Sequence, residues 1–334
     1  MGFDDDRTIV CSPEDMSAGK LCSSCGQIAK GLPPGAAFCP NCGSAFSQVR
    51  DFGPGAVIGQ YRILKELGSG GIGQVFMAHP VDNPGLRIAL KVLQKVFLDN
   101  ATVRERFNRE IRLLASLNLD YIVRYYNSWN DENGEYLAME YIDGMNLAQM
   151  VDQDYEFTPD VVLEIMETLA MVFRYAYDRL ELLHRDIKPS NIMISNNGEL
   201  KILDFGLAKS LKEDNMLTLN GRVMGSPGFM SPEQFRNAKD VDVTADIFSL
   251  GATAYFLLTR KNPFDGENEL ELYQNMISTT PESIRKQNPA VSEHMETLIM
   301  SMLSKEPKKR PFSWKKLQVD IDRVKNGRPP VPNN

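Results

Sequence analysis

Residues 184–191 read His-Arg-Asp-Ile-Lys-Pro-Ser-Asn and lead into a pattern typical of a tight hairpin. Two short strand patterns come next, at residues 192–195 and 199–203. The Asn-Gly step between them, at residues 197–198, is a strong hairpin signal. Because a hairpin brings its chain back, Asn191 and Asp204 are expected to lie side by side, as two oxygen ligands of one Mg²⁺ must. The stretch therefore predicts that an amide and a carboxylate able to bind a metal meet where the hairpin opens.

A lone lysine, Lys91, lies inside an otherwise apolar strand pattern at residues 88–93. Desolvating its charge is costly unless an anion meets it. Downstream, Glu110 falls on the apolar stripe of a helical pattern over residues 107–114, so it faces inward. Two inward-facing opposite charges suggest an ion pair between Lys91 and Glu110. The alternative is that Lys91 reaches solvent and Glu110 lies at the helix edge.

A glycine-rich string, Gly-Ser-Gly-Gly-Ile-Gly-Gln-Val, occupies residues 68–75. A strand pattern follows Gly73, whereas a dinucleotide fold needs a helix there and a P-loop needs Lys followed by Ser or Thr. The string is therefore predicted to be a flap between two strands, with Gly68, Gly70 and Gly73 allowing close backbone approach to phosphates. A flexible hairpin tip without a ligand is the alternative for the string alone.

In this order along the chain, the motifs resemble those of protein kinases. The resemblance implies that Lys91 touches the α- and β-phosphates of ATP and is held by Glu110, and that Val75 and Ala89 help to bind the nucleotide. Residues 139–144 resemble the hinge between the two lobes of such an enzyme. Further roles implied there are adenine binding by the backbone of Glu140 and Ile142, and a gatekeeper side chain at Met139.

The 184–191 stretch resembles the catalytic loop of the same family, and residues 204–206 resemble its Asp-Phe-Gly motif. The resemblance implies that Asp186 orients the substrate hydroxyl and accepts its proton, and that Lys188 steadies the γ-phosphate. By the same resemblance, Asn191 and Asp204 hold Mg²⁺, and Lys188 favours Ser/Thr over Tyr substrates. His184 is expected to pack in the core without a role in proton transfer.

Residues 231–233, Ser-Pro-Glu, resemble the Ala-Pro-Glu motif that ends the substrate-binding P+1 loop. Arg310 stands where the family places the arginine that pairs with this glutamate. Ser226 and Ser231 depart mildly from the commoner threonine and alanine, without removing a group required for phosphoryl transfer. Asp246 resembles the helix aspartate that braces the catalytic loop; alternatively, it is a carboxylate favoured by a helix start.

Three hydroxyls, Ser210, Thr218 and Ser226, lie between Asp204 and the Ser-Pro-Glu motif. A phosphate on this segment could pair with Arg185 and order it. We favour Thr218 as the regulatory site, because Ser226 is expected to contact Asp186 and Lys188 instead.

The cysteines form two matching knuckles, Cys22-Ser-Ser-Cys25-Gly and Cys39-Pro-Asn-Cys42-Gly, which resemble a zinc ribbon. Four thiolates at this spacing suit one tetrahedral Zn²⁺, and metal binding would supply the folding energy of so small a module. Unrelated free cysteines and a redox Cys-x-x-Cys pair are the alternatives. Cys11 is left over as a plain thiol.

The chain has 334 residues and a formal net charge of −7, which gives no support for broad binding to nucleic acid or anionic lipid. Its first eight residues are acidic rather than signal-like, and no apolar stretch reaches the roughly 18 residues of a membrane span. We therefore expect a cytoplasmic protein. Strand patterns give way to helical patterns after about Asn146.

The predicted fold class is α+β: a bilobal protein kinase fold with a small antiparallel β-sheet lobe plus one helix and a large, mainly helical lobe, preceded by the zinc ribbon. The expected division is a disordered tail at 1–19, the ribbon at 20–46, a linker at 47–60, the kinase domain at 61–324 and a Pro-rich tail at 325–334 that is too polar to pack.

The expected function is ATP- and Mg²⁺-dependent transfer of phosphate to Ser/Thr hydroxyls of protein substrates, with structural Zn²⁺ and an unknown partner at the ribbon. One alternative is a pseudokinase scaffold that binds nucleotide while the ribbon recruits a partner. Another is a zinc-ribbon nucleic-acid binder, which is disfavoured because residues 20–46 contain only Lys20 and Lys30 as basic residues.

Overall fold

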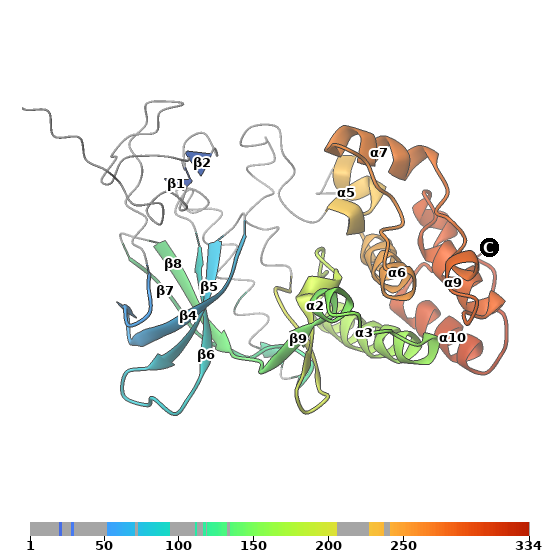
Figure 1. Cartoon of the computed structure of the whole chain (residues 1–334). Coiled ribbons are helices and arrows are strands. Elements are labelled where there is room, and N and C mark those ends of the chain that lie inside the picture. Colours follow the sequence, from blue (N-terminus) through green and yellow to red (C-terminus); the bar gives the residue numbers. More distant parts are fainter. Residues whose placement is uncertain are drawn as a thin grey trace, which may run out of the picture. The chain divides into compact units, whose positions relative to one another are not determined.

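The computed structural model describes residues 52–70, 73–93, 111, 116–117, 119–131, 134–205, 227–236 and 241–333, together with the backbone of 20–21 and 28–29. The described residues from Gly53 onward belong to one compact unit, in which a sheet is followed along the chain by helices (Figure 1). The two short N-terminal strands, β1 (Lys20–Leu21) and β2 (Ile28–Ala29), pair with each other in antiparallel fashion.

The first lobe is built on a six-stranded antiparallel sheet with the order β3-β4-β5-β6-β8-β7. Its strands are β3 (Val57–Ile58), β4 (Tyr61–Gly70), β5 (Gly73–Pro80), β6 (Ile88–Leu93), β7 (Tyr125–Asp131) and β8 (Gly134–Glu140). The central strand β6 is buried along its whole length, which matches its apolar sequence. Of the helix expected at residues 107–114, the structure describes only Ile111, which is helical and buried.

The sheet begins earlier than the sequence suggested, so the predicted linker at residues 47–60 is wrong at its C-terminal end. Val57 and Ile58 pair with β4, and Ile58 is buried. The glycines that suggested a linker instead make turns, because Gly55 and Gly59 have positive φ angles of 91° and 56°.

The second lobe is mainly helical, and its first helix begins at Leu147, as the change of pattern after Asn146 predicted. Its helices are α2 (Leu147–Asp152), α3 (Pro159–Leu180), α5 (Pro232–Arg236), α6 (Val243–Thr259), α7 (Glu269–Ser278), α8 (Ile284–Gln287), α9 (Glu293–Met302) and α10 (Trp314–Lys325). Three short strands, β9 (Gly144–Asn146), β10 (Ile192–Ser195) and β11 (Leu200–Ile202), form a second sheet in the order β11-β10-β9.

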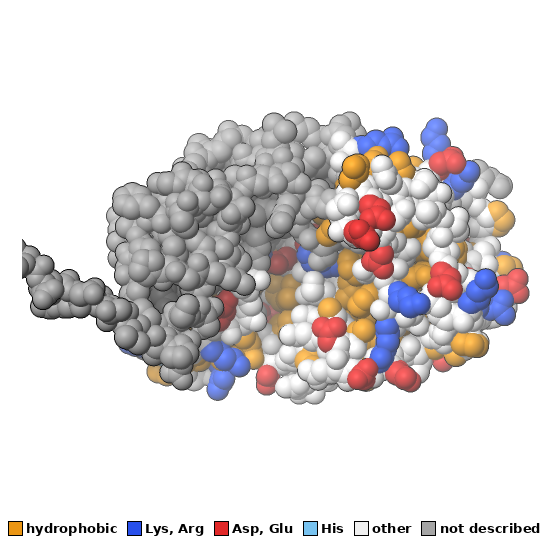
Figure 2. All heavy atoms as spheres, turned by 45° about the horizontal axis from the view of Figure 1, so that its top comes forward, with side chains coloured by type: hydrophobic (Ala, Val, Ile, Leu, Met, Phe, Trp, Pro, Cys, Tyr) orange, Lys and Arg blue, Asp and Glu red, His pale blue; other side chains and the backbone are white. Residues whose placement is uncertain are grey.

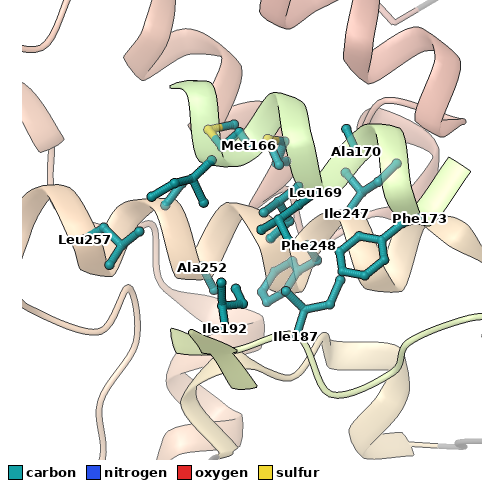
Figure 3. Close-up of a cluster of buried hydrophobic side chains, with 14 of the residues drawn as sticks. Met166, Leu169, Ala170, Phe173, Ile187, Ile192, Ile247, Phe248, Ala252 and Leu257 are labelled. Atoms are coloured by element: carbon teal, nitrogen blue, oxygen red, sulfur yellow. The ribbon is translucent and has the colours of Figure 1, made fainter. Parts of the chain in front are cut away.

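The core of the helical lobe lies between α3 and α6, and both helices are well capped. Thr158 caps the start of α3 with Pro159 at its first position, and Asp242 caps α6. Figure 3 shows Leu169 and Phe173 of α3 facing Phe248 of α6, with Ile187 and Ile192 closing the cluster from the loop and strand below. Helix α6 is buried on nearly all sides, so it serves as the centre on which the other elements pack. Among the described residues, no helix is both long and apolar enough to span a bilayer.

The C-terminal segment packs against α10, contrary to the expectation of a tail too polar to pack. The Val331 amide donates to the buried carboxylate of Asp320 at 2.9 Å, and Lys316 Nζ donates to the Val331 carbonyl at 2.8 Å. Arg323 similarly bonds the carbonyl of Pro329 at 2.8 Å. Prolines keep this segment extended and leave its carbonyls free, so cationic side chains of α10 can bind them.

Candidate functional site

The predicted hairpin is confirmed, and it places Asn191 and Asp204 at its open end. Strands β10 and β11 pair with Ile192 opposite Ile202, and the Leu203 amide donates to the Asn191 carbonyl at 2.8 Å. Gly198 takes a φ of 82° in the turn, a conformation that favours glycine. The residues on either side of the hairpin are therefore fixed by backbone pairing.

Asp186 is the centre of a compact polar group in the loop before the hairpin. Its Oδ2 atom accepts from Lys188 Nζ and from Asn191 Nδ2, both at 2.9 Å. Asn191 Nδ2 also donates to the Asp186 carbonyl at 2.9 Å. The Oδ2 atom of Asp186 is thus held by a cation and an amide. Its other carboxylate oxygen is contacted by neither the Lys188 ammonium nor the Asn191 amide. The structure brings together all three residues that the catalytic-loop pattern singled out.

Lys91, in strand β6 of the sheet lobe, forms an ion pair with Asp204. Its Nζ atom lies 2.6 Å from Asp204 Oδ1. Burial is the largest single effect and would raise the pKa of Asp204, but the charge and hydrogen bond of Lys91, together with the charge of Lys188, lower the pKa overall, so the carboxylate stays ionised. Asp204 has a left-handed backbone, with φ at 49°. Glu110, the partner predicted for Lys91, lies outside the described residues.

Asp246 of α6 fixes the backbone of the catalytic loop through two hydrogen bonds. Its two carboxylate oxygens accept from the amides of His184 and Arg185, at 2.7 and 2.6 Å. His184 packs against Phe205 with ring centroids 4.8 Å apart, and burial lowers the pKa of its ring to about 4. The imidazole is therefore neutral near pH 7, which fits the packing role expected of it.

An apolar cluster beside Lys91 joins the two lobes. Its buried members come from the sheet lobe and the segment that leaves it, and partly buried side chains of β5, β10 and the segment after β11 pack on them. The members are Ala89, Val123, Met139 and Ile142, with Val75, Tyr125, Met193 and Leu203 against them. Val75, Ala89 and Ile142, which were predicted to bind the nucleotide, thus lie together with the predicted gatekeeper Met139.

The glycine-rich string lies between two paired strands, as predicted. Gly70 of β4 stands opposite Gly73 of β5, and residues 71–72 lie outside the described part. A Cβ atom on Gly73 would come within 2.0 Å of the Val92 carbonyl oxygen, so this glycine is required by the close approach of β6. Among the described residues, nothing lies within 4 Å of a Cβ atom built on Gly68.

Sequence reasoning missed Lys201, which ties the hinge to the hairpin. Its Nζ bonds Glu140 Oε1 at 3.0 Å, and the other carboxylate oxygen of Glu140 accepts from the Arg124 amide at 3.1 Å. Lys201 is buried, like Lys91. The missed signal was the same one that identified Lys91, a lysine in an apolar strand pattern.

The predicted pair between Glu233 and Arg310 is formed. The guanidinium binds both carboxylate oxygens, at 2.6 and 3.0 Å, and donates as well to the carbonyls of Ser304, Thr244 and Lys305. Arg310 is fully buried.

Several predicted site residues lie outside the described part of the chain. They are the four ribbon cysteines Cys22, Cys25, Cys39 and Cys42, and also Glu110, Thr218 and Ser226. Within the described part, no group of three or more His, Cys, Asp or Glu side chains is arranged to hold a metal by itself. A Mg²⁺ held by Asn191 and Asp204 would thus take further oxygens from phosphates and water, as this ion commonly does.

A comparison with family models identifies the chain. The model described as the protein kinase domain matches residues 61–319. The chain belongs to the protein kinase family. The matched range thus contains the six-stranded sheet except β3, and also the hairpin, the ion pair of Lys91 and nearly all of the helical lobe.

Three curated relatives of this kinase come from bacteria. It is 31% identical over 276 residues to a probable serine/threonine-protein kinase of Streptomyces coelicolor, and 31% identical over 265 residues to serine/threonine-protein kinase PrkC of Bacillus subtilis. It is 29% identical over 282 residues to serine/threonine-protein kinase PknB of Mycobacterium tuberculosis. These matches cover 81%, 79% and 83% of this chain but only 41%, 40% and 45% of the relatives. The chain therefore spans less than half the length of these relatives.

Solved structures show the same fold. The kinase domain of Mycobacterium tuberculosis PknI superposes with a TM-score of 0.65 at 23% identity, covering 82% of this chain and 99% of that domain. Rad53 residues 1–466, solved in complex with AMP-PNP, match with a TM-score of 0.64 at 26% identity, covering 78% of this chain and 64% of that one. The two lobes found here are therefore those of the bilobal kinase fold.

Proposed function

We propose that this kinase transfers the γ-phosphoryl group of ATP to serine or threonine hydroxyls of protein substrates. The observation that carries the proposal is the convergence of Asp186, Lys188 and Asn191 in one hydrogen-bonded group, with Asp204 at the end of the same hairpin and Lys91 paired to it. The serine/threonine-protein kinases among its relatives support the choice of substrate class.

Each residue has a role that its contacts make possible. The Asp186 carboxylate, fixed by Lys188 and Asn191, can orient a substrate hydroxyl and accept its proton at the oxygen that they leave open. Lys188 lies within 3 Å of that carboxylate, so its charge can also offset charge on a transferred phosphoryl group. Lys91 is a buried cation whose present partner is a carboxylate, and phosphate oxygens are acceptors of the same kind.

The residues present fit ATP and Mg²⁺ as cofactors. The apolar cluster of Ala89, Met139 and Ile142 suits an adenine ring, with the backbone of Glu140 and Ile142 as proposed adenine partners. Asn191 and Asp204 offer an amide and an ionised carboxylate as Mg²⁺ ligands. When bound, the ion would neutralise phosphate charge.

Radiolabel transfer from ATP to a generic Ser/Thr protein substrate tests the proposal. We expect Lys91→Ala and Asp186→Asn each to lower the transfer rate by about 10²-fold or more, because each removes a group aimed at developing charge. Lys325→Ala is a matched control, since it breaks an ion pair with Glu167 on the surface of the helical lobe, and it should retain wild-type activity.

The same experiment separates the enzyme from a pseudokinase scaffold. A scaffold would bind nucleotide without transferring phosphate. Any transfer seen in its preparations would come from a contaminant and would not depend on Asp186. Undiminished transfer by Asp186→Asn, or none by the wild-type protein with Mg²⁺ present, would reject the proposed function.

We also propose that residues 20–46 form a zinc ribbon in which Cys22, Cys25, Cys39 and Cys42 bind one structural Zn²⁺. The antiparallel pairing of β1 with β2 supports this, because Lys20 stands opposite Ala29 and the first Cys-x-x-Cys pair falls in the connection between the two strands. A knuckle on a short hairpin is the usual local geometry of such a site. The partner of the ribbon is not identified by these features.

Metal analysis of the whole chain tests the ribbon. We expect about one zinc per chain, lost in Cys22→Ser and in Cys39→Ser, because structural sites use four ligands. Cys11→Ser is the matched control and should keep the metal. Zinc content that survives Cys39→Ser, or depends equally on Cys11, would count against the ribbon.

A nucleic-acid-binding role for the ribbon is the less favoured alternative. The chain carries a net charge of −7, and the described face in Figure 2 shows acidic and basic side chains interspersed over the helical lobe. Such a surface lacks the basic stripe that binds phosphate backbones. Salt-dependent retention of the whole chain on nucleic acid would reverse this preference.

We propose that phosphorylation of the segment after Asp204 regulates the kinase. Thr218 is the favoured site, with Arg185 as its partner and Ser226 reserved for contact with the catalytic loop. Mass mapping after incubation with ATP tests this, since Thr218 should become modified as activity rises. Fully active protein with unmodified Thr218 would refute it.

A further proposal concerns the cellular compartment of the kinase and the bounds of its catalytic domain. We propose a cytoplasmic kinase with its domain near residues 61–324, which fits reduced, metal-binding cysteines. Fractionation of cells that express the chain would test the compartment.

A further inference from the structure

Gln234 of α5 is a buried amide with both ends in use. Its Oε1 atom accepts from the Ser231 amide at 3.0 Å and from the Ser231 hydroxyl at 3.3 Å. Its Nε2 atom donates to the carbonyl of Arg185 at 3.1 Å. Since a carbonyl can only accept, the amide nitrogen must be the end that faces Arg185.

The Ser231 side of this arrangement is a helix cap. The Gln234 backbone amide donates to the Ser231 hydroxyl at 3.4 Å. In turn, the Ser231 backbone amide donates to Oε1 of the Gln234 side chain. This reciprocal Ser-x-x-Gln pattern is a capping box, in which glutamate serves as well as glutamine. The cap therefore explains Ser231, where the resemblance led us to expect alanine, but it does not explain why residue 234 is glutamine.

The Arg185 side of the arrangement explains that choice. Arg185 has a left-handed backbone with φ at 63°, a conformation that costs a non-glycine residue free energy and persists only where its surroundings fix it. Asp246 holds the Arg185 amide at 2.6 Å, and Gln234 holds the carbonyl on the other side of the same residue. The Arg185 carbonyl shares a planar peptide group with the Asp186 amide, so fixing it fixes the start of Asp186.

Helix α5, which carries Gln234 (Figure 1), is itself held by a buried ion pair. The residue before Gln234 is Glu233, which is bound by the two terminal nitrogens of the fully buried Arg310 guanidinium. A side chain held by a fixed helix can position a loop more accurately than one on a mobile segment.

We propose that Gln234 is a positioning residue for Asp186, acting through the Arg185 carbonyl, and that catalysis requires an amide rather than a carboxylate at this capping position. The inference rests on the proposed phosphotransfer activity for its kinetic consequence, but its structural consequence can be measured without that activity.

Gln234→Glu is the decisive variant, because it keeps the acceptor that caps α5 and removes the donor to Arg185. We expect kcat to fall about tenfold, the cost of roughly one positioning hydrogen bond, while KM for ATP changes by less than about twofold. The matched control is Gln149→Glu, the same change in the exposed capping box that Asn146 and Gln149 form on α2. That control should leave both constants unchanged.

Amide hydrogen exchange gives the second readout. In Gln234→Glu, the amides of residues 184–186 should exchange faster, because the loop loses one of its supports. In Ser231→Ala, which loses the cap hydroxyl but keeps the Nε2 donor, faster exchange should be confined to residues 231–236. Should Gln234→Glu fail to fold, Gln234→Met removes the donor without adding charge and takes its place.

Two outcomes would overturn the inference. One is a folded Gln234→Glu protein with wild-type kcat. The other is wild-type exchange at residues 184–186 in that variant. If the wild-type protein transfers no phosphate, the proposed function fails, and the exchange measurement alone still decides whether Gln234 positions the loop.

Discussion

Two buried ion pairs, Arg310–Glu233 and Lys91–Asp204, hold this kinase together in different ways. The first is saturated, because Arg310 binds both carboxylate oxygens and three backbone carbonyls. Within the described part of the chain, the second consists of one contact at 2.6 Å. The Arg310 guanidinium has no N–H donor left for another ligand, whereas Lys91 makes one contact and can still donate to a phosphate. The comparison distinguishes a pair that stabilises the fold from a pair available for chemistry.

Breaking the saturated pair should have the largest effect on stability. Arg310→Met leaves the Glu233 carboxylate and three backbone carbonyls without their hydrogen-bond donor. We therefore expect the free energy of unfolding to fall by about 3–5 kcal/mol. Among the described residues, Lys91→Met leaves one carboxylate and no backbone carbonyl without its partner, so its loss should be clearly smaller. Urea denaturation of both variants measures this, and equal losses would remove the distinction between the two pairs.

A cation beside the saturated pair should make stability depend on pH. Lys305 Nζ lies 3.4 Å from the Phe264 ring centroid and has no hydrogen-bond partner within the described part of the chain. Burial, and then the charge of Arg310, lowers the pKa of this amine from 10.5 to about 7. Between those values the unfolded chain binds more protons than the folded one, so this group makes stability rise with pH from about 7 towards 10.5.

Lys305→Met removes this titration. The variant should gain melting temperature over wild type at pH 6 to 7, and the gain should shrink as the pH approaches 10. Calorimetric scans at both ends of the range measure the difference. A gain that is independent of pH would show that Lys305 titrates normally.

The smallest effect is expected next to Lys91 and Asp204. Within the described residues, the Tyr125 hydroxyl is buried without a hydrogen-bond partner, and burial followed by the negative charge of Asp204 raises its pKa. Tyr125→Phe removes an unsatisfied group, so the free energy of unfolding should stay the same or rise by up to about 1 kcal/mol. A loss beyond 1 kcal/mol in thermal or urea unfolding would mean that the hydroxyl is bound.

Local patterns predicted the parts of the site that are close in sequence. The hairpin from Asn191 to Asp204 follows from an Asn-Gly turn between two strand patterns, and the structure pairs those strands. The buried position of Lys91 follows from its apolar strand. In both cases the signal that determines the geometry lies within a few residues.

Contacts between distant segments could not be predicted in this way. Gln234 and Arg185 are 49 residues apart, and Lys201 and Glu140 are 61 apart. A capping box reveals one end of the glutamine amide, but only the fold reveals what the other end meets. The predicted linker failed near Val57 for a related reason, because Gly55 and Gly59 allow either a flexible connection or the tight turns observed.

We propose that Lys91 and Asp204 bind metal and triphosphate together. Calorimetric titration with a non-hydrolysable ATP analogue, with and without Mg²⁺, tests it in wild type and in Asp204→Asn. We predict that Mg²⁺ tightens binding to the wild type by about tenfold or 1.4 kcal/mol and that Asp204→Asn abolishes this gain. An equal Mg²⁺-dependent gain in both proteins would contradict the account.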